Sequence, residues 1–171
     1  MLIMAEEESR FGRIDRPRRC WAPKPLRPTV PRQVVREFVY VFAAVWAHLG
    51  RLTSLILPTA NTEMMNLFLA HVAQEFSSAF IILLVDRAGW HTTPQVRVPE
   101  NMRLLPQPAR SPELNPTEHV WEELREKELA NKSFPALRPL EHALCAGLSA
   151  LAADPKRVQS LTDFPYLRVT F

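Results

Sequence analysis

Hydrophobic residues recur along the chain with two different periods, and the strand-like runs are clearest in its first two thirds. Residues 2–7 predict the remainder of a first strand, and the apolar, partly β-branched runs 38–47 and 52–57 predict a hairpin. The run 80–85 is continuously apolar, which is typical of a central strand covered on both faces. A short strand is expected near 102–105.

Three later segments have helical spacing. Residues 62–76 predict an amphipathic helix capped by Asn61 or Thr62. A second helix is expected from Pro116 to about Ala130, and a last one over 135–153 with its start near Ser133. The second helix is expected to bury Val120, Trp121, Leu124 and Leu129. The order strand, hairpin, helix, strand, strand, helix predicts an α/β fold with a mixed sheet flanked by helices, followed by coil after Asp154.

Composition limits the class of protein. At 171 residues and 47% hydrophobic content, the chain fits one α/β domain with its own core. No apolar run reaches the ~18–20 residues that cross a bilayer, and residues 1–5 are too short, and are followed by acids, to be a signal peptide. Cys20 and Cys145 form neither a metal motif nor a disulfide framework, so we expect a reducing, cytoplasmic setting and no membrane partner.

Charge is unevenly divided. From Arg10 to Arg36 there are nine Lys or Arg residues and one acid, Asp15, so this segment has a net charge of +8. The rest of the chain has a net charge of −5, which gives +3 for the whole chain. Its prolines and Trp21 predict a basic, extended loop over 13–36 that lies along a DNA backbone or a partner subunit, although a solvated surface is the alternative. The expected DNA contacts are Arg16, Arg18, Arg19, Lys24 and Arg27.

Two acids stand where chemistry is expected. Asp86 ends the run 80–85, and ligands of open α/β sheets bind outside the carboxyl ends of the strands. Glu118 follows Asn115 and Pro116 at the third position of a predicted helix. Each has a structural alternative, since Asp86 can begin a turn and Glu118 can complete a capping box with Asn115.

Together these segments resemble the second half of a DDE transposase, in the bacterial insertion-sequence branch of the mariner superfamily. The resemblance lies in residues 85–91 (VDRAGWH), 98–101 (VPEN), 104–106 (LLP) and 111–121 (SPELNPTEHVW). Upstream, residues 8–12 (ESRFG) and 55–69 also match, so it extends over nearly the whole chain.

The resemblance implies a ribonuclease-H-like, retroviral-integrase-like fold. Its acidic triad binds two divalent ions, Mg²⁺ or Mn²⁺, and cuts and rejoins DNA strands. Asp86 matches the second acid and Glu118 the third. The first is expected in an Asp-Glu pair before Arg-Phe-Gly, where this chain has Glu7 and Glu8.

Glu7 is therefore the candidate for the first acid. Its carboxylate stands one carbon–carbon bond, about 1.5 Å, farther from the backbone than that of Asp. Magnesium demands near-ideal octahedral geometry, so a weakened or inactive enzyme is one expectation. The alternative is that residues 6–8 are merely a solvated acidic run.

The chain departs from the family a second time before the third acid. It reads LPQPARSP over 105–112 where the family has Leu-Pro-Pro-Tyr-Ser-Pro, which removes an aromatic packing residue but no metal ligand. His91 and His119 lie near the acids in sequence. They are candidates for phosphate contacts, but we favour packing or surface roles, which are more usual for a single histidine.

The resemblance also suggests partners and organisation. We expect a catalytic domain over 1–155, a C-terminal tail over 156–171, transposon-end and target DNA as ligands, a homodimer, and a bacterial, nucleoid-associated location. Family members carry a helix-turn-helix region ahead of the catalytic part. Because the first acid lies near the start of this sequence, that region is expected either from a neighbouring reading frame or to have been lost by decay.

Three hypotheses follow. The first is an active catalytic domain that works with a separate DNA-binding half. The second is a remnant that folds and binds DNA or a transposase subunit without cutting. The third is a ribonuclease-H-like nuclease that cleaves without joining strands.

Overall fold

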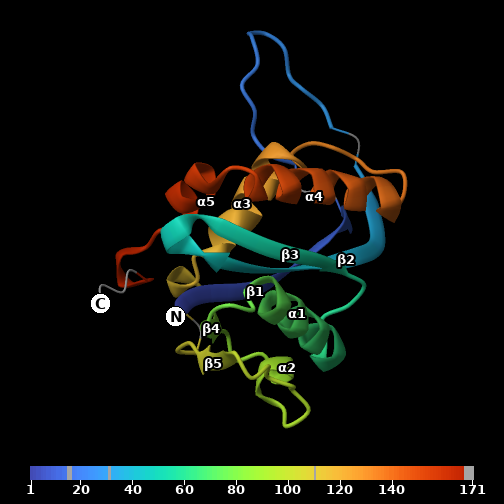
Figure 1. Ribbon diagram of the computed structural model, residues 1–171. Helices are drawn as coiled ribbons and strands as arrows, with labels where there is room; N and C mark the ends of the chain where they lie inside the picture. The colour runs from blue at the N-terminus through green and yellow to red at the C-terminus, as the bar shows by residue number, and fades with distance from the viewer. Residues whose placement is uncertain (15–16, 31, 110, 168–171) are drawn as a thin grey trace.

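A five-stranded mixed sheet lies between two layers of helices in the computed structural model, which describes residues 1–14, 17–30, 32–109 and 111–167 (Figure 1). The strand order is β3-β2-β1-β4-β5. The strands are β1 (Leu2–Ile14), β2 (Val34–Trp46), β3 (Arg51–Leu57), β4 (Ile81–Val85) and β5 (Met102–Pro106). β1, β2 and β3 pair antiparallel, whereas β4 runs parallel to β1 and to β5.

Helices cover both faces of the sheet. Helices α3 (Thr117–Lys127), α4 (Leu137–Ala152) and α5 (Pro155–Thr162) lie on one face, and α1 (Thr62–Glu75) and the short α2 (Gly89–Thr92) lie on the other (Figure 1). Single 3₁₀ turns, η1 (Ala47–Leu49), η2 (Pro112–Leu114) and η3 (Pro165–Leu167), complete the described elements. None of the described helices is long and apolar enough to cross a membrane.

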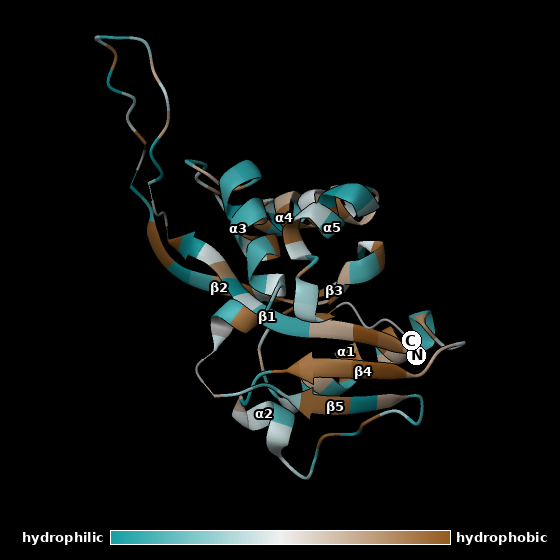
Figure 2. Cartoon of the chain, turned by 90° about the vertical axis from the view of Figure 1, so that its left-hand side faces the viewer, coloured by the Kyte–Doolittle hydropathy of each residue, from teal (hydrophilic) through white to brown (hydrophobic). Residues whose placement is uncertain are grey.

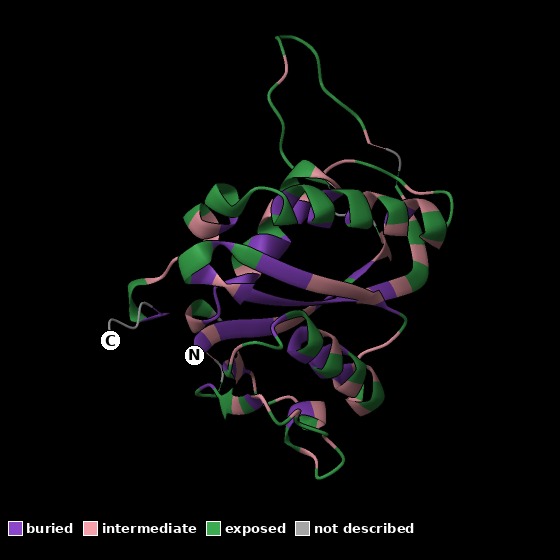
Figure 3. Ribbon diagram, viewed as in Figure 1, coloured by how far each residue is buried: buried purple, intermediate pink, exposed green. Residues whose placement is uncertain are grey.

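The core has two parts because alternate residues of each strand point to opposite faces. On β2, Val41 and Val45 pack with Trp121 and Leu144 on the side of α3 and α4, and Phe42 packs against α1 on the other side. Buried residues accordingly line both faces of the sheet (Figure 3).

Because side chains alternate between the two faces of the sheet along β1, its three successive acids point to different faces. Phe11 packs in the core on the side of α3, whereas Met4 packs on the side of α1. Since Glu7 has the parity of Phe11 and both Glu6 and Glu8 have that of Met4, Glu7 faces α3 and the other two face the opposite layer.

The hairpin, the strand at 80–85, the short strand near 102–105 and the helix at 62–76 are confirmed, and the Asn61 side chain caps α1 by accepting from the Met64 amide. The predicted burial of Val120, Trp121 and Leu124 is also confirmed, and Leu129 is partly buried against them.

The first strand is longer than expected. β1 continues past residue 7 to Ile14, because Ser9 and Phe11 keep the alternating burial and pair with β2. The basic loop therefore begins after the strand and not at residue 13.

Two predicted helix starts were early. The last helix begins at Leu137 and not near Ser133 or at 135. This start places Pro139 in the first turn, where a missing amide costs no helical hydrogen bond. The second helix begins at Thr117, one residue after the predicted Pro116.

The expected coil after Asp154 was wrong, because α5 begins there. The Asp154 side chain accepts a hydrogen bond from the Arg157 amide at 3.0 Å, and Pro155 occupies the first turn. Val158 is fully buried against the core on the side of α3 and α4. Asp followed by Pro is a helix start that the sequence already contained.

The proline-rich segment between β1 and β2, residues 17–30 and 32–33, projects from the body as a long arm in both views (Figures 1 and 2). Two side-chain amides hold its base. Asn131 exchanges hydrogen bonds with the backbone of Arg18 (2.9 and 3.1 Å), and Gln33 does so with the backbone of Phe134 (2.9 and 3.3 Å). We call this segment the basic arm.

Candidate catalytic and metal-binding site

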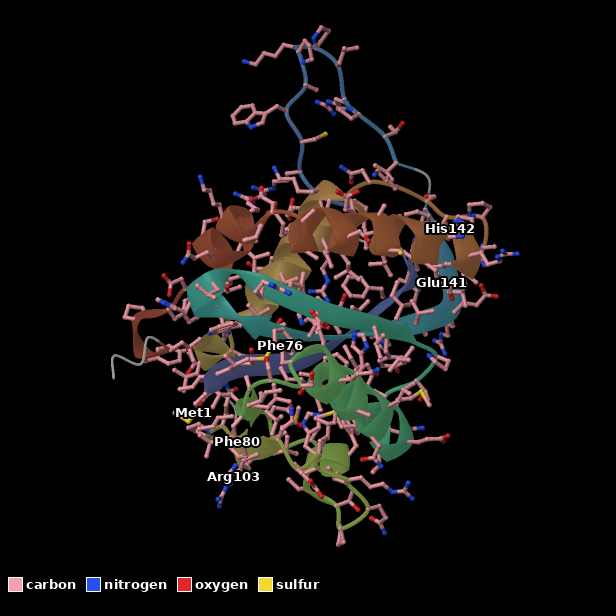
Figure 4. The ribbon with its side chains drawn as sticks, viewed as in Figure 1. Met1, Phe76, Phe80, Arg103, Glu141 and His142 are labelled. Atoms are coloured by element: carbon pink, nitrogen blue, oxygen red, sulfur yellow. The ribbon has the colours of Figure 1, made fainter. Side chains whose placement is uncertain are left out.

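The three predicted acids come from three elements that meet at one edge of the sheet. Parallel β1, β4 and β5 begin together at the opposite edge, where Met1, Phe80 and Arg103 lie close to one another (Figure 4). β4 and β5 also end together, at Val85 and Pro106, whereas β1 continues past them to Ile14, so the acids meet where β4 ends. Glu7 lies on β1 past the pair Ala5 and Leu84, and Asp86 follows β4 directly.

Glu7 lies among other acids. The pKa of Glu7 is raised to about 8, first by burial and then by the carboxylates of Glu8, Glu118 and Asp86, in that order, while His91 lowers it. The structure thus brings Asp86 and Glu118 close enough to Glu7 for their charges to raise its pKa.

Asn115 ties α3 to β1 at this point. Its buried amide donates to Glu7 Oε2 at 2.7 Å and to the Glu6 carbonyl at 2.8 Å, and its oxygen accepts from the Thr117 amide at 3.1 Å. The Thr117 hydroxyl donates to the Ala5 carbonyl at 3.1 Å. These bonds fix the first turn of α3, which carries Glu118, against the strand that carries Glu7.

The capping-box alternative is therefore not how this segment is built. Pro116 occupies the N-cap of α3 without a side-chain cap bond. The side-chain NH₂ group of Asn115 donates to two groups on β1, so this residue joins the helix to the strand and is more than a helix cap.

Asp86 both begins a turn and faces the site. Its Oδ1 accepts from the Ala88 amide at 2.7 Å and lies 2.7 Å from Nδ1 of His91, yet its side chain remains 47% exposed. Gln107, which follows β5, holds this turn through its backbone. Its backbone N–H donates to the Val85 carbonyl, and its backbone carbonyl accepts from the Arg87 side chain. Gln107 lies in the stretch that departs from the family pattern.

A second cluster lies on the other face of β1. Nε2 of His91 is 2.7 Å from Glu8 Oε1 and 3.6 Å from Glu6 Oε2, and the Trp90 indole donates to Glu8 Oε1 at 2.6 Å. One donor atom from each of Glu6, Glu8 and His91 lies within 4.8 Å of the others, a spacing at which they could hold a metal ion.

This cluster corrects one expectation and extends another. Residues 6–8 are not a solvated acidic run, because the side chains of Glu6 and Glu8 are 0% and 5% exposed. His91 is buried and packs against Trp90, as the favoured role implies, but it also contacts the carboxylates of Glu8 and Asp86. The period-two spacing of Glu6 and Glu8 was the signal in the sequence, but nothing there placed His91 opposite them.

The protonation of this cluster follows from its burial. Burial raises the pKa of Glu6 well above its usual range, with further increases from Glu8, Glu7 and Asp86. Burial lowers the pKa of His91, but the hydrogen bond and charge of Glu8, followed by Asp86, outweigh it and raise that pKa above its usual value.

Four of the predicted DNA contacts, those among the described residues, lie on the basic arm. Arg19, Lys24 and Arg27 are exposed, and Arg18 at its base pairs with Glu126 at 2.6 Å. Arg16 lies outside the described residues. His119 is exposed, with Nδ1 2.8 Å from the Leu161 carbonyl, in agreement with the surface role expected for it.

Comparison with known proteins gives the family. The profile of the DDE superfamily endonuclease family matches residues 3–141. The uncharacterized protein y4pE/y4sA of Sinorhizobium fredii (strain NBRC 101917 / NGR234) is 37% identical over 125 residues, which are 72% of this chain and 93% of that protein.

Solved structures agree on the fold. The catalytic domain of Mos1 mariner transposase superposes with a TM-score of 0.57 at 15% identity, over 92% of this chain and 80% of that one. The Mos1 mariner paired-end complexes with Mn and with Mg give TM-scores of 0.64 and 0.61 at 16% identity, over 94% and 95% of this chain. The chain spans about half (53%) of the Mos1 chains in those complexes.

The mixed sheet flanked by helices is thus the ribonuclease-H-like fold of transposase catalytic domains. The chain belongs to the DDE superfamily endonucleases.

Proposed function

We propose that this chain is a transposase catalytic domain that cleaves DNA strands and transfers them in DNA transposition. The observation that carries the proposal is the meeting of Glu7, Asp86 and Glu118 at one edge of the sheet, in a member of this endonuclease family. Each acid comes from a different element, and these are the three residues that the family resemblance implies.

The donor set suits hard divalent ions. Glu7, Asp86 and Glu118 offer only carboxylate oxygens, the ligands that Mg²⁺ and Mn²⁺ prefer. Burial and the charges of neighbouring acids raise the pKa of Glu7, so cations bound between these acids would stabilise its charged form. Two bound ions would supply the charge that stabilises the attacking and leaving oxygens at phosphorus.

Other residues of the chain set the geometry of these acids. Asn115 orients the Glu7 carboxylate through its 2.7 Å hydrogen bond and holds α3 in place. His91 and the Ala88 amide both contact Oδ1 of Asp86. These contacts hold the half-exposed carboxylate and therefore also set the position of its other oxygen.

The basic arm is the proposed DNA contact. Arg19, Lys24 and Arg27 are exposed on it, with Arg18 at its base. Such cations bind phosphates without reading sequence. Base readout would require a separate helix-turn-helix half, and we propose that the chain works with one, as a homodimer on transposon-end DNA.

Glu7 favours a second candidate, a remnant that binds DNA without cutting it. A Glu at the first position places its carboxylate about 1.5 Å farther out than Asp does. In that case Glu7→Asp restores cleavage to a protein that otherwise only binds. A nuclease that cleaves without joining strands would be recognised by the absence of joined products.

The test is an in-vitro reaction with Mg²⁺ or Mn²⁺ on DNA that carries the inverted repeats flanking the gene. We expect cleaved and joined products, with rates at least about 100-fold lower for Asp86→Asn or Glu118→Gln, because loss of a metal ligand costs at least as much as loss of a residue that orients one. Glu100→Gln, an exposed acid on the turn before β5, is the control. Absence of any product at every protein concentration would refute the proposal.

A further inference from the structure

Glu6 is the most unusual residue outside the proposed catalytic triad. Its side chain is 0% exposed, and neither carboxylate oxygen has a hydrogen-bond partner in the described part of the chain. A buried polar group normally finds a hydrogen-bond partner, and a buried carboxyl group without one destabilises the fold. Something is needed to satisfy it.

His91 points its ring at this carboxylate and at that of Glu8. Nδ1 of the ring lies 2.7 Å from Asp86 Oδ1 and donates to it. Nε2 faces Glu8 Oε1 at 2.7 Å and Glu6 Oε2 at 3.6 Å, and a bound cation would take the place of any proton on Nε2. Three electron-rich atoms converge on one buried point, which is where a cation would be bound.

A proton on Nε2 would satisfy only part of this arrangement. One N–H can donate to Glu8 Oε1, which also accepts from the Trp90 indole at 2.6 Å. Both oxygens of Glu6 would still lack a donor. A divalent cation instead balances the two buried carboxylates and uses the lone pair of a neutral histidine.

We propose that Glu6, Glu8 and His91 bind a divalent transition-metal ion in a buried site separate from the Asp86, Glu118 and Glu7 triad. Mixed imidazole and carboxylate donors suit Zn²⁺ better than Mg²⁺. Two ligands of one ion with bonds of about 2.1 Å are at most about 4.2 Å apart. The donor atoms already lie within 4.8 Å, so small side-chain rotations complete the site.

The contacts around the cluster fit such a site. Asp86 holds the second ring nitrogen of His91, as carboxylates do for metal-binding histidines, and Trp90 donates to Glu8. The ion would connect β1 to α2 and, through His91, fix the orientation of Asp86. Its binding does not depend on whether the chain cuts DNA.

The experiment uses the full chain with Glu7→Gln and Glu118→Gln, which remove two of the three proposed catalytic acids and leave the buried cluster intact. Isothermal titration with Zn²⁺ is expected to show one tight site per chain, insensitive to excess Mg²⁺. X-ray absorption of the bound zinc is expected to show one imidazole among oxygen ligands. Since this uses no variant of the cluster, it does not depend on whether such variants fold.

Cluster variants on the same background complete the test. Glu6→Gln and His91→Gln are expected to weaken zinc binding at least about 100-fold, whereas His119→Gln and Cys145→Ser, at exposed positions, leave it unchanged. Circular dichroism checks that each variant is folded. No stoichiometric zinc, a zinc shell without imidazole, or tight binding that survives His91→Gln would each overturn the site.

Discussion

At the residue scale, the candidate site is defined by where β1 directs three successive acids. Glu7 faces Asn115 and α3, while Glu6 and Glu8 face His91 on the other side. β1 thus contributes acids to two clusters. Asp86 interacts with both, since its charge raises the pKa of Glu7 and its Oδ1 lies 2.7 Å from Nδ1 of His91. A substitution at any one of these positions is expected to disturb its own cluster first.

Glu7 gives a prediction for pH dependence in the absence of metal. Its pKa is about 8 in the folded chain and 4.5 in its ordinary state. A raised pKa means that the stability is fully present below pH 4.5 and is lost as the pH rises toward 8. Glu6 and His91 shift in the same direction. Glu7→Gln should therefore reduce the fall in Tm between pH 5 and pH 8.5, measured in EDTA, by at least about 2 °C.

The exposed Glu100→Gln is the matched control for this measurement, since it removes the same charge from the surface. It should leave the pH profile of the parent protein unchanged. Equal profiles for Glu7→Gln and the parent would mean that Glu7 titrates normally in the folded chain. Added Mg²⁺ should stabilise the parent more at pH 8.5 than at pH 5, because it binds the deprotonated acids.

At the element scale, the tight turn between β2 and β3 packs against α5, the helix that the sequence analysis missed. Gly50 has a φ of 61°, and a Cβ at this position would lie 1.8 Å from the carbonyl oxygen of Pro155. The glycine therefore allows both the left-handed backbone and the close approach of α5. Gly50→Ala should destabilise the fold by more than about 2 kcal/mol in urea denaturation.

Gly89 offers a control of the same kind. A Cβ there would meet no atom within 4 Å, and the residue begins α2. Gly89→Ala should change the free energy of unfolding by no more than about 0.5 kcal/mol. Similar effects at both glycines would show that α5 does not hold its position against the turn.

Individual elements show why sequence reasoning succeeded where it did. The continuous apolar run over 80–85 and the helical spacing over 62–76 each lie within one segment, so the local pattern was sufficient to predict both elements. The extension of β1 to Ile14 depends on pairing with β2, and the pairing of His91 with Glu6 and Glu8 spans more than eighty residues. Contacts of that range leave no local signal, and only the family resemblance brought Glu7, Asp86 and Glu118 together.

At the scale of the whole molecule, positive charge is concentrated on an arm that projects from the body, and negative charge remains with the body. The basic arm carries five cations and no acid (Arg18, Arg19, Lys24, Arg27 and Arg32), and segment 10–36, which includes the adjoining ends of β1 and β2, carries +8 against −5 for the rest. Anchoring by Asn131 and Gln33 fixes the base of the arm, while Trp21 at 103% exposure and the neighbouring cations contact solvent. Such an arm adds phosphate contacts without altering the core, so its effect on DNA affinity should be separable from stability.

The combined variant Arg19→Gln, Lys24→Gln and Arg27→Gln tests this separation. Each cation that contacts a phosphate contributes about 0.9 to the slope of log affinity against log salt, so losing three should reduce the slope by about 2 to 3. The Tm should stay within about 1 °C, because all three side chains are exposed. The control Arg97→Gln, Arg103→Gln and Lys156→Gln removes the same charge from exposed positions on the body. If both triple variants lower the slope equally, net charge and not the arm governs DNA binding.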